Sequence, residues 1–237
     1  GTGKSFVFDH LSRYARVIGG GKVTPAVLFH NNQSHEPGLV TRYDIVVLDE
    51  VQSVRGDSAG ELSAMLKVYL ESGKFSRGKT EATAESGFVM LANISLDERR
   101  IPINLEKGIF KEFPNFLRET AFIDRLHGII PGWYLPRVSQ DTPSIYLGFK
   151  GDLFAEILHS LRKDLKYVDY VNVKMHLSGC DDLRDKKAIT RTATAYLKLL
   201  FPNLEVSNEE FTKYCVKPAI ELRQKIRDEL WKMDREY

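Results

Sequence analysis

The sequence is poor in cysteine and has almost no charge imbalance. Cys180 and Cys215 are the only cysteines among 237 residues, and they are too far apart to resemble a metal-binding pair. We therefore expect two free thiols in a reducing compartment, the cytoplasm, rather than a disulfide-rich secreted domain. The formal net charge is only +2, which neither predicts nor excludes a nucleic-acid partner, because a local basic patch can lie within a neutral total.

Zinc-site and membrane signals are also missing. The six histidines form no H-E-x-x-H pattern and no cluster, which argues against a catalytic zinc. The sequence contains no apolar run near the length of a membrane span, and its start lacks the charged and apolar regions of a signal peptide. We expect no membrane partner. Hydrophobic residues make up 43% of the chain, enough for a sizeable core.

Strand-like and helix-like segments alternate in the first part of the chain. The patterns predict helices at residues 6–16 and 61–71, and strands at residues 26–29, 43–48 and 87–92. Residues 45–48 are uniformly apolar, which is typical of a central parallel strand covered on both faces. The alternation indicates an α/β fold, a parallel sheet with helices on both faces.

The second part of the chain reads mainly as helices. Pro131, Pro136 and Gly132 interrupt regular structure, and helices are expected at residues 153–165 and 183–201. Ser207 and Glu210 have capping-box spacing, which predicts a helix that is interrupted or restarts at Pro218 and runs to about residue 233. We therefore divide the chain into an α/β domain, residues 1–145, and a smaller helical domain, residues 146–237.

The chain opens on the second half of a phosphate-binding loop. In G-x-x-x-x-G-K-[ST], the lysine reaches the outer phosphates of a nucleotide and the hydroxyl binds Mg²⁺. The expected ATP-binding residues are Gly1, Thr2, Gly3, Lys4 and Ser5. The first glycine of the motif would precede residue 1, so we expect a truncated loop that holds nucleotide poorly. The alternative is a glycine-rich turn before a helix.

Two acids follow the apolar strand. Asp49 at its end is suited to hold Mg²⁺ together with Ser5, and Glu50 beside it is suited to polarise the attacking water. Carboxylates at the end of a buried strand are costly unless a cation or hydrogen bonds compensate. The alternative is an ordinary acidic turn, but both motifs in the right order indicate a nucleoside triphosphatase.

The order of these motifs resembles that of AAA+ P-loop ATPases. The resemblance implies that Asn93, after residues 88–92, is a sensor that orients the lytic water, although a turn-forming asparagine is the alternative. It implies that Arg125 is an arginine finger presented to a neighbouring subunit, against the alternative of a surface arginine. It also implies that Arg191 is a second sensor that touches phosphate, with Arg184 as a rival on spacing.

The loop at residues 72–80 is basic and bracketed by glycines. Several AAA+ branches carry a pore hairpin at this place, so Lys74, Arg77 and Lys79 are candidate contacts to a nucleic-acid backbone. The alternative is a solvated charged loop. Phe75 is the single aromatic residue in it, whereas a polypeptide translocator typically needs an aromatic-hydrophobic pore loop.

Within the AAA+ ATPases, the chain is most similar to the BrxL family, the Lon-like ATPases of bacterial BREX phage-defence systems. The segments that carry this resemblance are residues 37–44, 47–52 and 122–138. It implies a ring-shaped homo-oligomer, expected to be a hexamer, with ATP, Mg²⁺ and double-stranded DNA as ligands. It also implies flanking domains, with any Lon-type Ser-Lys protease dyad beyond Tyr237.

Three functions remain open from the sequence. The first is a DNA-engaging motor in phage defence, the second is the unfoldase ring of an ATP-dependent protease, and the third is an oligomerisation scaffold that does not hydrolyse nucleotide. The basic residues at 74–79 favour DNA.

Overall fold

The computed structural model describes residues 2–54, 59–140, 142 and 144–237. The chain forms two compact units. The first comprises Gly1–Phe122 and Pro131–His159, and the second comprises Ile123–Ile130 and Ser160–Tyr237. No helix among the described residues has both the length and the apolar character needed to cross a membrane.

The first unit is built on a parallel three-stranded sheet. Its strands lie in the order β1 (Ala15–Gly19), β4 (Ile45–Asp49) and β7 (Gly87–Met90). In the central strand, Val47 faces Val17 on one side and Val89 on the other. Val46 and Val47 are fully buried, which confirms the expected central strand covered on both faces.

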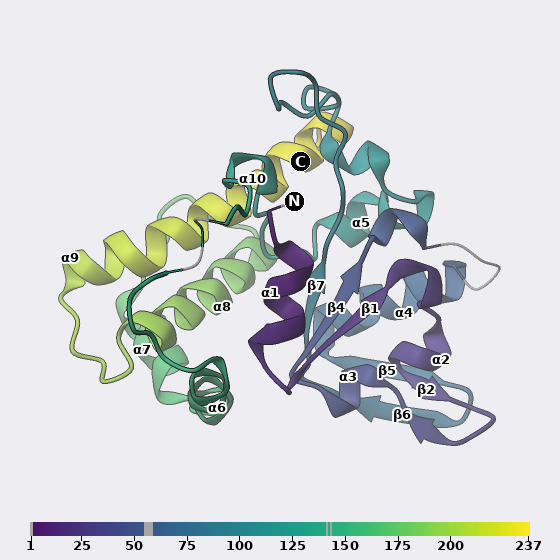
Figure 1. Cartoon of the computed structure of the whole chain (residues 1–237), viewed down its shortest axis with the longest axis horizontal. Helices are drawn as coiled ribbons and strands as arrows, with labels where there is room; N and C mark the ends of the chain where they lie inside the picture. The colour runs from purple at the N-terminus through teal and green to yellow at the C-terminus, as the bar shows by residue number, and fades with distance from the viewer. Residues whose placement is uncertain (1, 55–58, 141, 143) are drawn as a thin grey trace. The chain divides into compact units, whose positions relative to one another are not determined.

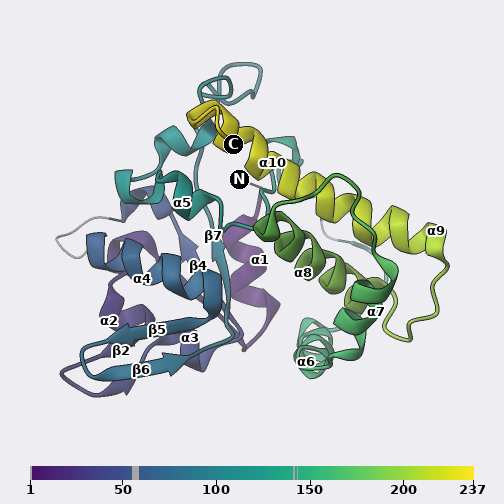
Figure 2. The same ribbon diagram turned by 180° about the vertical axis from the view of Figure 1, so that it is seen from behind.

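Helices pack on both faces of this sheet, as α/β alternation requires. Helix α1 lies in front of the sheet in Figure 1, and α4 lies in front of it in the reverse view of Figure 2. The helices of this part of the chain are α1 (Lys4–Leu11), α2 (Pro25–Leu28), α3 (Leu39–Arg42), α4 (Ala59–Ser72), α5 (Thr120–Ile123) and α6 (Gly151–Leu161).

Two small antiparallel hairpins complete the first unit. The shorter pairs β2 (His30–Asn31) with β3 (Glu36–Pro37). The other pairs β5 (Lys74–Arg77) with β6 (Thr80–Thr83) through a tight turn at residues 78–79. Gly78 has a φ of 62°, a left-handed conformation that glycine adopts without strain.

Two local expectations were wrong. The helix expected at residues 6–16 ends at Leu11, and Ala15 already begins β1, because pairing with β4 overrides the helical pattern. The strand expected at residues 26–29 is the short helix α2. Thr24 caps it by accepting a hydrogen bond from the backbone N–H of Val27 (3.2 Å), and Pro25 occupies the first turn, where its missing N–H costs nothing.

The second unit contains the helices α7 (Lys166–Lys174), α8 (Leu183–Leu200), α9 (Asn208–Phe211) and α10 (Lys217–Met233). The capping box between Ser207 and Glu210 is confirmed. The interruption expected at Pro218 takes the form of a π-helical turn at residues 212–216, immediately before α10. The core of this unit includes Tyr167, Val171, Ala193, Leu197 and Cys215.

Candidate nucleotide site

The first turn of α1 presents the two polar side chains of the phosphate-loop motif. Gly3 precedes the helix with a φ of 74°, so the chain enters α1 through a left-handed residue. Lys4 and Ser5 are the first two helical residues, and both are half-buried. Thr2 is also half-buried, whereas Gly1 lies outside the described residues. The N–H groups of a first helical turn, together with a lysine there, suit an anionic ligand.

The end of β4 brings Asp49 against this helix. Ser5 Oγ donates a hydrogen bond to Asp49 Oδ2 at 2.6 Å, across 44 residues of sequence. The other carboxylate oxygen, Oδ1, accepts the backbone N–H of Glu50 at 2.9 Å. The two residues that the sequence paired as metal ligands are therefore adjacent.

Asn93, three residues beyond β7, closes the site from the third segment. The ammonium of Lys4 donates to Asn93 Oδ1 at 2.5 Å. The backbone N–H of Asn93 makes a long contact of 3.5 Å with the side-chain oxygen of Gln52. Because β4 and β7 are parallel neighbours, their carboxyl ends lie at the same edge of the sheet, and the two following segments converge on Lys4 and Ser5.

Glu50 adopts an unusual backbone conformation. Its φ of 51° and ψ of 50° lie in the left-handed region, which costs a non-glycine residue about 1 kcal/mol or more. Its carbonyl oxygen accepts hydrogen bonds from the N–H and the hydroxyl of Ser53, at 2.8 and 2.7 Å. The side chain is exposed beside Asp49. The left-handed residue therefore ends the buried strand directly after Asp49.

Gly20 supports this turn and Gln52 contacts the backbone of Asn93, and neither role was expected from the sequence. A Cβ on Gly20 would lie 2.5 Å from the Glu50 carbonyl oxygen, so only glycine permits the close approach of the two chains. Gly20 is the middle of three consecutive glycines, and the sequence did not indicate which of them packs against Glu50. Gln52 follows the acidic pair by two residues, and this position is the one feature of the sequence that could have indicated its place near the site.

The oxygen donors of this site fit a magnesium ion. A hydroxyl and a carboxylate lie 2.6 Å apart at Ser5 and Asp49, and Mg²⁺ is bound by hard oxygen ligands together with water and phosphate oxygens. Lys4, next to Ser5 in the chain, is an ammonium suited to phosphate oxygens.

The remaining arginines of interest belong to the second unit. Arg125 is half-buried. The carbonyl oxygens of the residues on either side of it, Asp124 and Leu126, accept hydrogen bonds from Arg223. Arg184 Nη1 donates to Asp124 Oδ2 at 2.7 Å, so this rival for the second sensor takes part in a protein ion pair. Arg191 is exposed on α8.

His127, in the same segment as Arg125, lies near several cations of the second unit. Burial, together with the positive charges of Arg191, Arg223 and Lys187, lowers the pKa of His127 to about 4. The imidazole is therefore neutral near pH 7.

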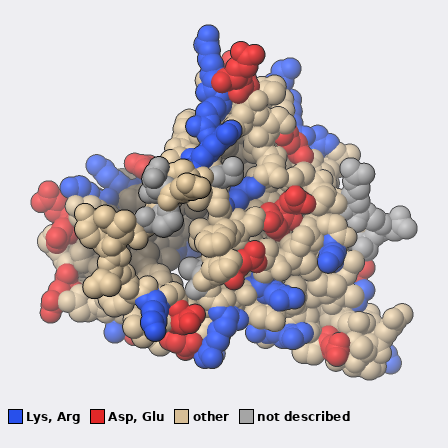
Figure 3. Space-filling view, in the orientation of Figure 1, with Lys and Arg blue, Asp and Glu red and all other residues tan. Residues whose placement is uncertain are grey.

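The β5–β6 hairpin separates its three candidate cations. Lys74 and Lys79 are exposed. Arg77 is held inside the unit, with Nε 2.9 Å from Glu61 Oε1 and Nη1 2.6 Å from the His30 carbonyl oxygen. Phe75 is 4% exposed, and its ring packs 5.2 Å from that of Phe29. Positive and negative side chains are interspersed on the face drawn in Figure 3. A nucleic acid on this face would therefore be bound by a few individual cations rather than by a continuous basic patch.

Comparisons with known proteins agree with the resemblance carried by the motifs. The family model described as "Lon-like protease BrxL-like, ATPase domain" matches residues 1–237. The chain belongs to this family. The protein named Lon-like protease BrxL from Escherichia coli O9:H4 (strain HS) is 31% identical over 233 residues, which is 98% of this chain and 33% of that relative. A second Lon-like protease BrxL, from Bacillus cereus (strain H3081.97), is 31% identical over 235 residues, which is 98% of this chain and 34% of that relative.

The chain thus spans about a third of the length of the relatives it matches. An ATPase-domain family implies that this part of the protein uses a nucleotide, and the α/β architecture with its parallel sheet is consistent with that use.

Proposed function

We propose that this chain is the ATP-hydrolysing core of a Mg²⁺-dependent AAA+ ATPase. The observation that carries the proposal is the convergence of Lys4, Ser5, Asp49 and Asn93 from three separate segments, with side-chain contacts of 2.5 and 2.6 Å. Lys4 neutralises the outer phosphates, while Ser5 and Asp49 hold Mg²⁺. Asn93 orients the attacking water, and the exposed Glu50 accepts its proton.

The wider AAA+ assignment adds roles for the second unit. It acts as the helical lid, Arg191 contacts phosphate, and Arg125 reaches the nucleotide of the next subunit in a homo-oligomeric ring. A guanidinium in that place stabilises the charge on the transferred phosphoryl group. Membership in the BrxL-like ATPase family supports these roles.

The test is Mg²⁺-dependent binding of a fluorescent ATP analogue to the complete gene product. Lys4→Ala should weaken binding at least tenfold, because it removes the ammonium at the phosphates. Asp49→Asn should make binding nearly independent of Mg²⁺, since the ion loses its charged ligand. Lys22→Ala removes an exposed lysine outside this set of residues, and it should bind like the wild type. Unchanged binding in both site variants contradicts the proposed pocket.

For the ligand of the assembled ring, we favour double-stranded DNA over an unfolding polypeptide. Lys74 and Lys79 offer two exposed ammonium groups on one hairpin, which suits a phosphate backbone. Phe75 is packed in the core against Phe29 and so is not presented to a polypeptide. Arg77, bound to Glu61 and His30, acts by holding the hairpin rather than by contacting DNA directly.

A further inference from the structure

Arg223 of α10 is a buried arginine that the site described above does not use. Its side chain is 2% exposed, and it is among the largest fully buried side chains of the described residues. A buried guanidinium is destabilising unless charges and hydrogen bonds compensate it. Its partners therefore indicate what the side chain holds in place.

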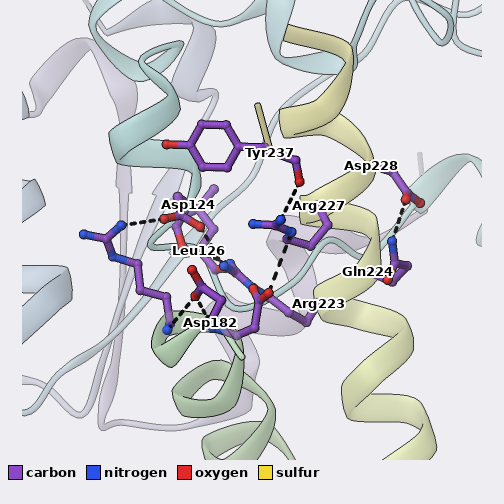
Figure 4. A network of polar contacts seen from close by, with 10 residues as sticks. Asp124, Leu126, Asp182, Arg223, Gln224, Arg227, Asp228 and Tyr237 are labelled. Carbon is purple, nitrogen blue, oxygen red and sulfur yellow. Dashed lines mark hydrogen bonds and ion pairs between the residues drawn. The ribbon is translucent and has the colours of Figure 1, made fainter. Parts of the chain in front are cut away.

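The partners of Arg223 come from two places in the second unit. On α8, Asp185 Oδ1 accepts from Nε at 2.5 Å. In the segment at residues 123–130, Asp124 Oδ1 accepts from Nη2 at 2.7 Å. Asp124 is itself 2% exposed, and its second oxygen accepts from Arg184. Figure 4 shows this network between the two helices and the segment.

Two further bonds from Arg223 go to backbone oxygens on either side of Arg125. Nη1 donates to the carbonyl oxygen of Asp124 at 2.9 Å and to that of Leu126 at 2.6 Å. One guanidinium thus fixes the carbonyl groups of the residues immediately before and after Arg125. An arginine can do this because its rigid fork presents several donors at set angles, which a lysine cannot reproduce.

The next residues of the segment also lie closely against α10. A Cβ on Gly128 would be 2.7 Å from the Cβ of Leu222, the neighbour of Arg223 in the helix. Only glycine permits this approach without displacement. The segment is therefore fixed at Asp124 and Leu126 by hydrogen bonds and at Gly128 by close packing.

We propose that Arg223 is a positioning residue for Arg125, which sets the direction in which the arginine finger leaves the backbone. This inference rests on the finger role proposed for Arg125. Catalysis by a finger depends on its placement, and a displacement of about 1 Å can lower a rate by about a hundredfold. Removing the two hydrogen bonds to the carbonyl oxygens should therefore reduce turnover without altering the pocket around Lys4.

The experiment is a double-mutant cycle on the turnover of ATP by the complete gene product. Arg223→Lys keeps the charge but removes the fork, and should lower kcat about ten- to a hundredfold while the nucleotide Kd changes less than about twofold. Arg125→Ala should lower kcat by about a hundredfold or more. In the Arg125→Ala background, Arg223→Lys should produce no further fall, because the group through which it acts is already gone.

Arg227→Lys is the matched control. Arg227 lies one turn further along α10 and is 3.7 Å from the same Asp185, whereas the hydrogen bonds to the carbonyls of residues 124 and 126 come from Arg223. The control should keep kcat within about twofold of the wild type, since the carbonyl hydrogen bonds remain in place. If Arg223→Lys does not fold, Arg223→Gln replaces it in the cycle, because its neutral amide is less costly to bury and lacks the guanidinium fork that donates to both carbonyl oxygens.

The outcomes separate the two ideas. An equal fall of kcat in both backgrounds assigns Arg223 a structural role and overturns the positioning inference, while the finger stands. A wild-type kcat for Arg125→Ala overturns the finger itself, and the inference with it.

Discussion

At the scale of single residues, the environment of His127 couples the stability of the protein to pH. The unfolded chain binds this proton near pH 6.5, whereas burial and neighbouring cations lower the folded pKa to about 4. The unfolded state therefore binds more protons between these values, and stability should fall as the pH falls through this window, by up to roughly 3 kcal/mol. Above pH 6.5 this group has no effect.

The measurement is urea unfolding of the wild type and of His127→Gln at about pH 7.5 and about pH 4.5. Because other carboxyl groups also titrate in this range, the comparison is between the two pH dependences. The variant should lose less stability on acidification than the wild type. Equal losses contradict the assigned role of His127.

Single residues were predictable from the sequence where the chemistry demands a particular residue type. A lysine, a hydroxyl, an acid and an amide were expected in that order, and the structure places Lys4, Ser5, Asp49 and Asn93 together. Arg223 could not be found in this way. Helix α10 carries several arginines and lysines, and only its packing against residues 123–130 buries one of them.

At the scale of elements, local patterns worked best where a single cause dominates. The capping box at Ser207 and the buried strand β4 were expected and are present. Strand β1 and helix α2 were misread, because pairing with β4 and a Thr-Pro helix start outweigh short apolar runs. The spacing of the charges did not show that Arg77 would pair with Glu61 while Lys74 and Lys79 remain exposed.

The β5–β6 hairpin carries the prediction about DNA. Removing one cation that touches a phosphate should reduce the slope of log affinity against log salt by about one. Lys74→Ala and Lys79→Ala of the complete gene product should each show this reduction on duplex DNA, and the effect should not depend on base sequence. The exposed Lys22 provides the control, because Lys22→Ala should leave the slope unchanged. Unaltered slopes in both hairpin variants would favour the polypeptide alternative, for which degradation of casein is the assay.

At the scale of the whole molecule, the sequence predicted an α/β sheet followed by helices, and the parallel sheet with flanking helices is present. The membership of residues 123–130 in the second unit was not foreseeable, because it depends on interactions of Arg223 and Gly128 that span about a hundred residues. The BrxL-like family accounts for the order of the motifs along the chain.

The most direct test of the proposed ATPase activity compares the Glu50→Gln variant of the complete gene product with the wild type. The rate of ATP hydrolysis and the affinity for ATP are measured on the same preparation. The exposed carboxylate beside Asp49 is the proposed base, so the amide should keep nucleotide affinity and lower kcat by about two to four orders of magnitude. Glu106→Gln, an exposed acid in a turn elsewhere, should leave both quantities unchanged. Wild-type turnover in Glu50→Gln would contradict the proposed mechanism.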